Sequence, residues 1–175
     1  MKIETYEKEI KVTDYIEGYV CVEEFLEKCK ACENFERKWS CPSYDFDPVE
    51  DYWKKFETLK VVGKKMVFEE GEKENWQTLV GEVQDALTAE LFDREAAVPG
   101  SQSLSAGSSR ICEVDNCARK NGEPCRFPDQ LRYSIESLGG NVGLTCTKLL
   151  GVPLQWMEAG KVPDYFVLVG GLLYD

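Results

Sequence analysis

The chain contains a first group of cysteines whose spacing suits a metal site. These residues, Cys29, Cys32 and Cys41, form a C-x2-C-x8-C pattern, and Pro42 follows the last thiol. Two thiols at the C-x2-C spacing can reach one metal from a single turn, and a third can return from a short loop whose backbone a proline restrains. The pattern therefore predicts that this first trio binds a metal.

A second trio, Cys112, Cys117 and Cys125, lies about half the chain further on and follows the same general design. The two trios use six of the eight cysteines. The other two, Cys21 and Cys146, have no further cysteine at ligand spacing and lie in apolar segments. We therefore expect them to pack in the interior rather than to bind metal.

The chain has 175 residues, 43% of them hydrophobic, so residues 1–175 are expected to form a single cysteine-rich metal-binding domain that buries a core without cross-links. Its first residues alternate charged and apolar types, unlike a signal peptide, and no run reaches the roughly 18 apolar residues of a membrane span. We expect a cytoplasmic protein without a membrane partner. In that compartment a cysteine cluster is more often a metal or redox site than a disulfide framework.

The chain has no histidine, so any metal must be held by thiolates and oxygens. A thiol enzyme using Cys29 or Cys32 as nucleophile would need a lysine or an arginine-lined pocket to activate it. The 32 acidic and 21 basic residues give a net charge of −11. This charge argues against a nucleic-acid partner, whose phosphates need a basic surface. The partners that we expect are a redox protein or a small molecule.

Charge and spacing near the trios bear on the kind of metal. Residues 28–41 and 110–126 hold eight of the 21 basic residues and five acidic ones. This local positive charge lowers thiol pKa values and stabilises an anionic thiolate centre. Structural zinc ribbons usually pair two C-x2-C motifs, which the second trio, C-x4-C-x7-C, does not match. A proline beside a cysteine is common near iron–sulfur clusters. The pattern favours an iron–sulfur cluster, with structural zinc as the alternative.

Apolar periodicity predicts the elements that must position these thiols. Alternation of apolar and polar residues indicates a strand, and apolar residues three and four positions apart indicate a helix. In chain order, the expected elements are an edge strand at 2–12, a helix at 20–28 ending at Cys29, a helix at 49–56 opened by Pro48 and capped by Asp47, a strand at 59–69, a long helix at 73–97 and a central strand at 165–174.

Three further features complete this prediction. Gly63 interrupts a strand and suggests a bulge. The small polar residues 101–109 are typical of a flexible linker, which runs into Cys112. A helix is expected to begin at Pro128 and to end before Gly139. Together the elements predict an α+β or α/β fold, with a mixed sheet, packed helices and two cysteine-bearing loops.

Several motifs surround the trios in a fixed order. They are Cys29-x-x-Cys32-x-x-Phe35-x-x-x-Trp39-Ser40-Cys41-Pro42, Gly107-Ser108-x-Arg110-x-Cys112, Cys117-Ala118, and Pro124-Cys125-Arg126-x-Pro128. In this order they resemble an uncharacterised bacterial and archaeal family described as predicted metal-binding proteins. The resemblance covers most of the chain and implies metal binding.

The second motif of that family has four cysteines, with C-x2-C-x2-C ahead of Cys-Arg-x-Pro, which is iron–sulfur spacing. This chain departs from it, because Ser109 stands where the first of these cysteines would be and four residues separate Cys112 from Cys117. The leading interpretation is one [4Fe–4S] centre on the second trio, with Ser109 or a thiol of the first trio as fourth ligand. A protein with such a cluster is expected to act as an electron carrier or to take part in cluster-assisted redox chemistry. Because three thiolates leave such a site one ligand short, we expect the two trios to lie close together.

Overall fold

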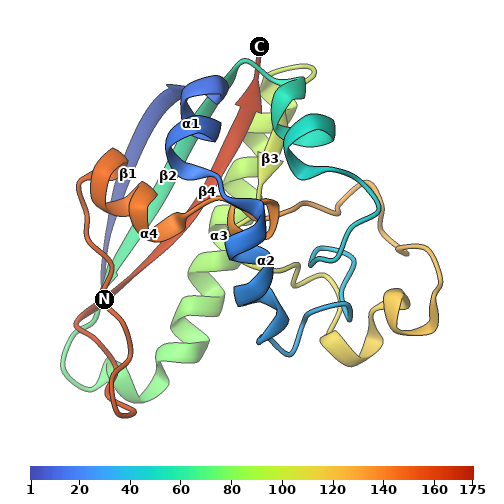
Figure 1. Ribbon diagram of the computed structural model, residues 1–175. Coiled ribbons are helices and arrows are strands. Elements are labelled where there is room, and N and C mark those ends of the chain that lie inside the picture. Colours follow the sequence, from blue (N-terminus) through green and yellow to red (C-terminus); the bar gives the residue numbers. More distant parts are fainter.

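The computed structural model describes residues 1–175, except for the side chain of Val114. Four strands form one sheet in the order β1-β2-β4-β3, and every neighbouring pair of these strands is antiparallel (Figure 1). Their bounds are β1 Lys2–Lys11, β2 Thr58–Val67, β3 Gln102–Leu104 and β4 Tyr165–Tyr174. The α+β class is confirmed, and the sheet is antiparallel rather than mixed.

Strand β2 is apolar on both sides because it lies inside the sheet. Leu59 and Val61 face one core cluster, whereas Val62 and Met66 face clusters on the other side of the sheet. The predicted bulge at Gly63 is wrong, since this residue pairs in regular register with both neighbouring strands. A Cβ at this position would lie 2.8 Å from Leu150 Cδ1, so close packing explains the glycine.

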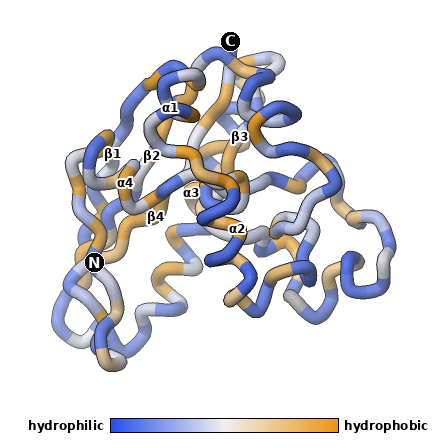
Figure 2. Tube along the Cα trace, viewed as in Figure 1, coloured by the Kyte–Doolittle hydropathy of each residue, from blue (hydrophilic) through white to orange (hydrophobic). Residues whose placement is uncertain are grey.

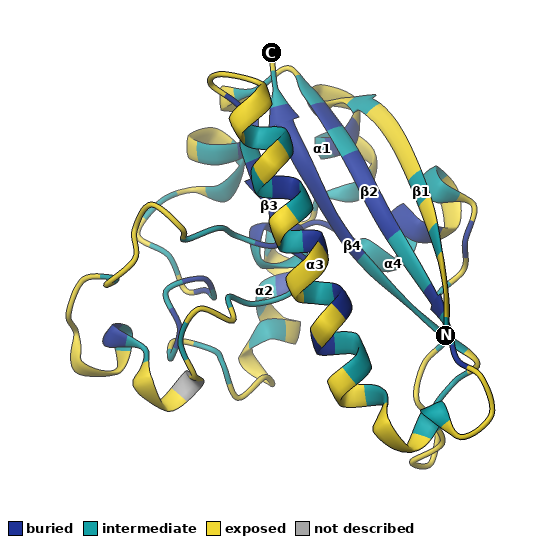
Figure 3. Cartoon of the chain, turned by 180° about the vertical axis from the view of Figure 1, so that it is seen from behind, coloured by how far each residue is buried: buried dark blue, intermediate teal, exposed yellow. Residues whose placement is uncertain are grey.

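Helices cover both faces of the sheet. Helix α3 (Trp76–Ala97) crosses one face and buries Val83, Leu87 and Leu91 there (Figure 3). Helices α1 (Val12–Tyr19), α2 (Val22–Lys30) and α4 (Val142–Leu144) lie toward the other face (Figure 1). Hydrophobic residues run along β4, and the outlying loops are largely hydrophilic (Figure 2). The core is therefore built on both sides of the two central strands.

The largest of the three core clusters includes the buried residues of α1. Within it, Trp53 Nε1 donates to Leu138 O at 2.9 Å, and the hydroxyls of Tyr15 and Thr145 are 2.8 Å apart. These bonds satisfy polar atoms that burial would otherwise leave unpaired. The buried members of the cluster are Val12, Tyr15, Trp53, Leu59, Val61, Leu104, Ile135, Leu138, Cys146, Val169 and Leu173.

The helical segment that begins at Pro48 agrees with its prediction. A wide helical turn covers Pro48–Tyr52 and a 3₁₀ turn follows at Trp53–Lys55. Asp47 Oδ1 accepts from the N–H groups of Val49 and Glu50, at 2.9 and 3.0 Å. The predicted cap is thus formed, and it orients the chain that returns from the first trio.

Two predictions beside the second trio are wrong. Residues 102–104 are not a linker but strand β3, which pairs with β4. The chain from Pro128 to Ser134 is not helical, and only a 3₁₀ turn at Glu136–Leu138 precedes Gly139. The reason is tertiary: Ser105 N donates to Tyr133 O at 2.9 Å, so this backbone bonds to the segment after β3 rather than to itself.

Candidate functional site

The first trio lies at and after the C-terminus of α2. Cys29, the expected end of this helix, lies in its last turn, since the helix continues to Lys30. Cys32 follows in a turn closed by its N–H, which donates to Cys29 O at 3.0 Å. Cys41 returns after the loop, where its N–H donates to Lys38 O at 3.1 Å. Cys29 and Cys41 are half-buried and Cys32 is exposed, and all three are free thiols.

Burial raises the pKa of the Cys29 and Cys41 thiols, contrary to the lowering expected from the local positive charge. Burial, and to a smaller extent the charges of Cys41, Glu136 and Cys32, raise the pKa of Cys29 to about 11. Burial also raises the pKa of Cys41, while a hydrogen bond from Ser40 and the charge of Lys38 act in the opposite direction. Ligation by these thiols therefore requires a metal that displaces their protons.

The second trio lines a small cavity. Cys112, Cys117 and Cys125 meet there with Ser109, in a space of about 30 Å³. Lys38, Trp39 and Ser40 of the first loop also line it, and Ile111, Phe127 and Leu131 complete the wall. The wall offers three thiols and two hydroxyls and no carboxylate, and thiolates are the soft ligands that suit iron, zinc or an iron–sulfur cluster. The donor types therefore suit a metal centre, whereas the space, which equals about one water, would have to widen for a cluster.

Hydrogen bonds join the loop of the first trio to that of the second. Lys38 Nζ donates to Ser109 O at 2.8 Å, and Ser109 N donates to Ser40 Oγ at 3.0 Å. Trp39 Nε1 donates to Glu123 O at 2.8 Å. The two loops lie side by side beyond the edge of the sheet (Figure 1). The expectation that the loops of the two trios come together is confirmed.

Arg119 extends from the second loop and binds the backbone of the first. Its Nη1 donates to Lys38 O at 3.1 Å and to Cys41 O at 2.5 Å, and its Nη2 donates to Ser43 O at 2.7 Å. The guanidinium also lies 5.1 Å from the centre of the Trp39 ring. One side chain therefore fixes the backbone on both sides of a candidate ligand.

The thiols are near one another but not arranged for ligation. Among the described residues, no three cysteine, aspartate or glutamate side chains converge closely enough to hold a metal ion. A bound metal would need rotation of the thiol side chains, which are free to turn because none forms a disulfide. The agreement with a metal site therefore lies in donor type and location.

Glu136 belongs to these surroundings and was not identified from the sequence. Its Oε2 atom is closed to solvent and has no hydrogen-bond partner among the described residues, although the residue as a whole is partly exposed. Burial raises its pKa, and its charge raises the pKa of both Cys29 and Cys146. The only sequence signal was an acidic residue between Ile135 and Leu138, two positions of a core pattern.

The two cysteines outside the trios have different environments. Cys146 is fully buried in the larger core cluster, as expected. Cys21 is exposed at the N-cap of α2, so its interpretation as a packed residue is wrong. The reason is local, because the helix begins only at Val22 and its buried residue is Phe25. That neither thiol binds metal stays a prediction.

A family model described as "Predicted metal-binding protein (DUF2284)" matches residues 15–174, which include both trios. No match was found among curated proteins or among solved structures. No helix in the described part of the chain is long and apolar enough to cross a membrane.

Proposed function

The chain belongs to this family of predicted metal-binding proteins, and from that premise we propose that the metal is an iron–sulfur cluster, [4Fe–4S] in type, bound by the second trio. The thiolates of Cys112, Cys117 and Cys125 would supply three ligands. Ser109 or a thiol of the first trio would supply the fourth. The proposed role is electron transfer or cluster-assisted redox chemistry with a redox protein or a small molecule in the cytoplasm.

One observation carries this proposal, which is the shared cavity at the second trio. Three thiols separated by up to thirteen positions in sequence line the same small space with Ser109. The described part of the second loop has little regular structure and few buried apolar residues, so the packing of a core does not account for this shared cavity. Thiols that share a cavity without forming disulfides are typical of cytosolic metal sites.

The surrounding residues support an anionic centre. Lys38 and Arg119 place positive charge in the two loops, which would balance the negative charge of a thiolate-bound metal centre. Trp39 lines the cavity and limits the access of water. A cluster bound here would supply one-electron transfer. The chain's own residues would hold the thiolates, balance their charge and shield them.

Structural zinc is the second candidate, and the loops give a reason to consider it. Residues 31–47 and 105–135 contain only short turns and are joined mainly by side-chain hydrogen bonds. A zinc ion would fasten such loops to the sheet, and the protein would then act as a binding or interaction module. Zinc would need no redox partner.

Metal analysis after anaerobic purification tests the proposal. We expect iron and acid-labile sulfide in near-equal amounts, with a broad visible absorption that bleaches on reduction. Cys112→Ser and Cys125→Ser should each lose most of the iron, whereas the control Cys21→Ser should retain it. Zinc without iron would establish the structural alternative, and a protein without either metal would leave the thiol-enzyme interpretation.

A further inference from the structure

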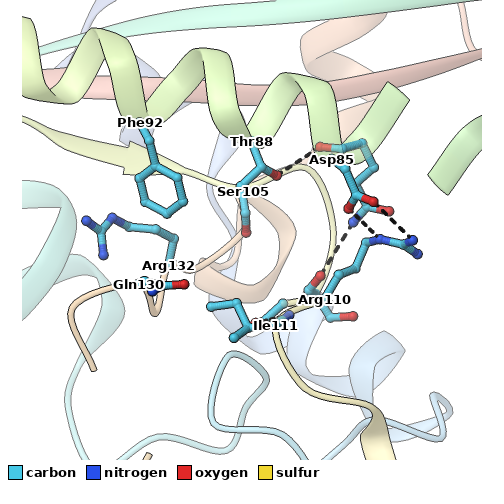
Figure 4. Close-up of a pocket in the computed structure, with 11 residues that line it drawn as sticks. Asp85, Thr88, Phe92, Ser105, Arg110, Ile111, Gln130 and Arg132 are labelled. Atoms are coloured by element: carbon cyan, nitrogen blue, oxygen red, sulfur yellow. Dashed lines mark hydrogen bonds and ion pairs between the residues drawn. The ribbon is translucent and has the colours of Figure 1, made fainter. Parts of the chain in front are cut away.

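A second cavity, of about 210 Å³, lies beside the loops that carry the two cysteine trios. It is enclosed by α3 on one side and by residues 105–111 and 130–132 on the other (Figure 4). Ser109 and Ile111 line both this cavity and the one at the second trio. A molecule bound in the larger cavity would therefore lie next to the candidate metal ligands.

The uncharged part of the wall is mixed. Phe92 and Ile111 supply apolar surface. Two wall hydroxyls are already donors inside the protein, since Thr88 Oγ1 donates to Gln84 O and Ser105 Oγ donates to Gly107 O, both at 2.9 Å. Specific attraction for a charged ligand must come from the ionic groups of the wall.

Arg132 is one of these groups, but its structural contacts occupy it. Its Nε and Nη2 donate to the two oxygens of Glu95, at 3.0 and 2.5 Å. Its Nη1 donates to Asp129 O and Leu131 O, and the guanidinium lies 4.9 Å from the centre of the Phe92 ring. This arginine therefore fixes the wall and offers little to a ligand.

Arg110 and Asp85 form the other ionic pair, and it retains free capacity. Arg110 Nε lies 2.8 Å from Asp85 Oδ1, and Nη2 lies 3.5 Å from Oδ2. The two side chains are 48% and 62% exposed, so the pair itself adds about 0–1 kcal/mol to stability. Hydrogen bonds among the described residues use two of the five N–H groups of Arg110, and Asp85 retains acceptor sites.

Gly81 makes room for the Arg110 guanidinium on α3. A Cβ at this position would lie 2.9 Å from Nη2, 3.3 Å from Cζ and 3.4 Å from Nη1. Glycine in a helix interior costs about 1 kcal/mol relative to alanine. The absence of a Cβ at Gly81 therefore leaves space on α3 for the guanidinium that pairs with Asp85.

We propose that this cavity binds a small zwitterion of amino-acid type. Its carboxylate would accept from the free N–H groups of Arg110, and its ammonium group would donate to Asp85. The two charges of the protein cancel, so a ligand that carries both signs satisfies them, whereas a simple anion is repelled by Asp85 and a simple cation by Arg110. The volume equals that of about seven waters at ~30 Å³ each, which suits a small amino acid.

This inference goes beyond the proposed function, because it rests on the cavity and holds whichever metal the thiols bind. Phe92 and Ile111 would contact the side chain of the ligand, which favours an apolar one. L-Valine is therefore a suitable probe. Isovalerate is valine without its amino group, and isobutylamine is valine without its carboxylate.

Calorimetric titration of the purified protein tests the pairing of charges. We expect L-valine to bind with a Kd below about 1 mM and at least about tenfold more tightly than isovalerate or isobutylamine. Equal affinity for valine and isovalerate would show an anion site and overturn the proposal. Absence of binding by all three probes would overturn it as well.

Variants locate the binding. Arg110→Gln and Asp85→Asn should each weaken valine binding by about tenfold or more. Gly81→Ala keeps both charges but displaces the guanidinium, so it should weaken binding while the helix becomes no less stable. Lys73→Gln is the control, because it breaks a different exposed pair, with Asp164 at 2.8 Å. Unchanged binding in Arg110→Gln and Asp85→Asn would contradict the assignment.

The design also separates this inference from the proposed cluster. Iron, zinc and sulfide are measured in the same preparations. Valine binding by a protein without iron supports the zwitterion site and rejects the cluster, whereas iron without valine binding does the reverse. If Arg110→Gln does not fold, Gly81→Ala and Asp85→Asn decide the outcome.

Discussion

Ser109 is the residue at which the loops, the thiols and the larger cavity meet. Its N–H and carbonyl bond to the first loop, and its side chain lines both cavities. Its hydroxyl accepts from Ile111 N at 3.3 Å, which keeps the oxygen within its own turn. A serine oxygen is a harder and less acidic ligand than a thiolate, so it binds iron weakly. If the second trio binds a cluster, this position would determine how firmly its fourth corner is held.

Replacement of this hydroxyl by a thiol gives a direct prediction. Ser109→Cys should increase iron per chain, or lengthen the lifetime of the visible absorption in air, because a thiolate closes the weak corner. Both quantities are measured beside the wild type after anaerobic purification. If iron content, spectrum and lifetime are all unchanged, the open-cluster hypothesis loses its basis and structural zinc becomes the better interpretation.

The two cysteines outside the trios give a second prediction. Cys146→Ser places a hydroxyl in the core and should lower the free energy of unfolding by about 2 kcal/mol. Cys21→Ser changes an exposed residue and should alter it by less than about 0.5 kcal/mol. Metal per chain, measured by elemental analysis, should stay the same in both variants. Denaturant titration measures their free energies of unfolding. Loss of metal in either variant would add that thiol to the site.

At this scale the sequence indicates donor types but not their surroundings. Spacing was sufficient to select the six thiols of the two trios, whose ligand role stays a prediction. Spacing could not identify Glu136, nor the role of Arg119 in joining the loops, because both depend on residues about 80 to 110 positions away in the chain. It also misplaced Cys21, since one residue at a helix start decides whether a side chain is buried.

Helix α3 is the element that connects the sheet to the larger cavity. Glu95, near its C-terminal end, accepts from Ser103 N at 2.7 Å and from the Arg132 guanidinium. These bonds attach α3 to β3 and to the segment after the second trio. Arg132 also donates to Asp129 O and Leu131 O of its own segment, so its side chain links α3 to this non-helical stretch.

Glu95 makes this attachment pH-dependent. Burial raises its pKa, but the hydrogen bonds from Arg132 and Ser103 outweigh burial, and the pKa of the folded state is lowered below 4.5. Because the folded pKa is the lower one, the stabilisation is present above about pH 4.5 and is lost as the pH falls through the folded value.

Glu95→Gln tests this dependence. At pH 7 the free energy of unfolding of the variant should be about 2 kcal/mol lower than that of the wild type, since a charged hydrogen-bond acceptor is replaced by a neutral one. The difference should shrink as the pH is lowered below 4.5. Denaturant titrations from pH 7 to pH 3 measure both effects, and a gap that stays constant over this range would contradict the assignment.

Long elements were predictable because burial repeats along them. Strand β4 is apolar at consecutive positions and lies between two others, and α3 shows a recurring apolar face. Short elements beside the site were not predictable. Strand β3 has three residues, of which two are serine or glutamine, and it forms because β4 offers an edge rather than because its own residues favour a strand.

For the whole molecule, the sheet and its helices form a frame beside which the two cysteine loops lie. The loops are far apart in sequence, and only their ligand count suggested that they come together. In the structure, hydrogen bonds supply the connection, and most of the donors are side chains near the trios. The basic residues that were interpreted as an electrostatic bias therefore have a second use, because Lys38 and Arg119 fasten one loop to the other.

Replacement of Arg119 is the strongest test of the connection between the two loops. This arginine donates to the carbonyls of Lys38, Cys41 and Ser43, so its planar group spans the return of the first loop. Lysine has one ammonium group and cannot span these three carbonyls. Arg119→Lys should keep the charge but lose metal to a chelator several-fold faster than the wild type, with the free energy of unfolding lowered by about 2 kcal/mol.

Arg126→Lys is the matched control for this variant. Arg126 also lies in the second loop, beside a thiol, but it donates to one carbonyl, that of Asn116 at 2.7 Å. Lysine can satisfy a single acceptor, so metal release should differ little from that of the wild type. Equal release rates in the two variants would mean that charge alone holds the loops, because both replacements preserve charge and only Arg119→Lys removes the bridge between the two trios.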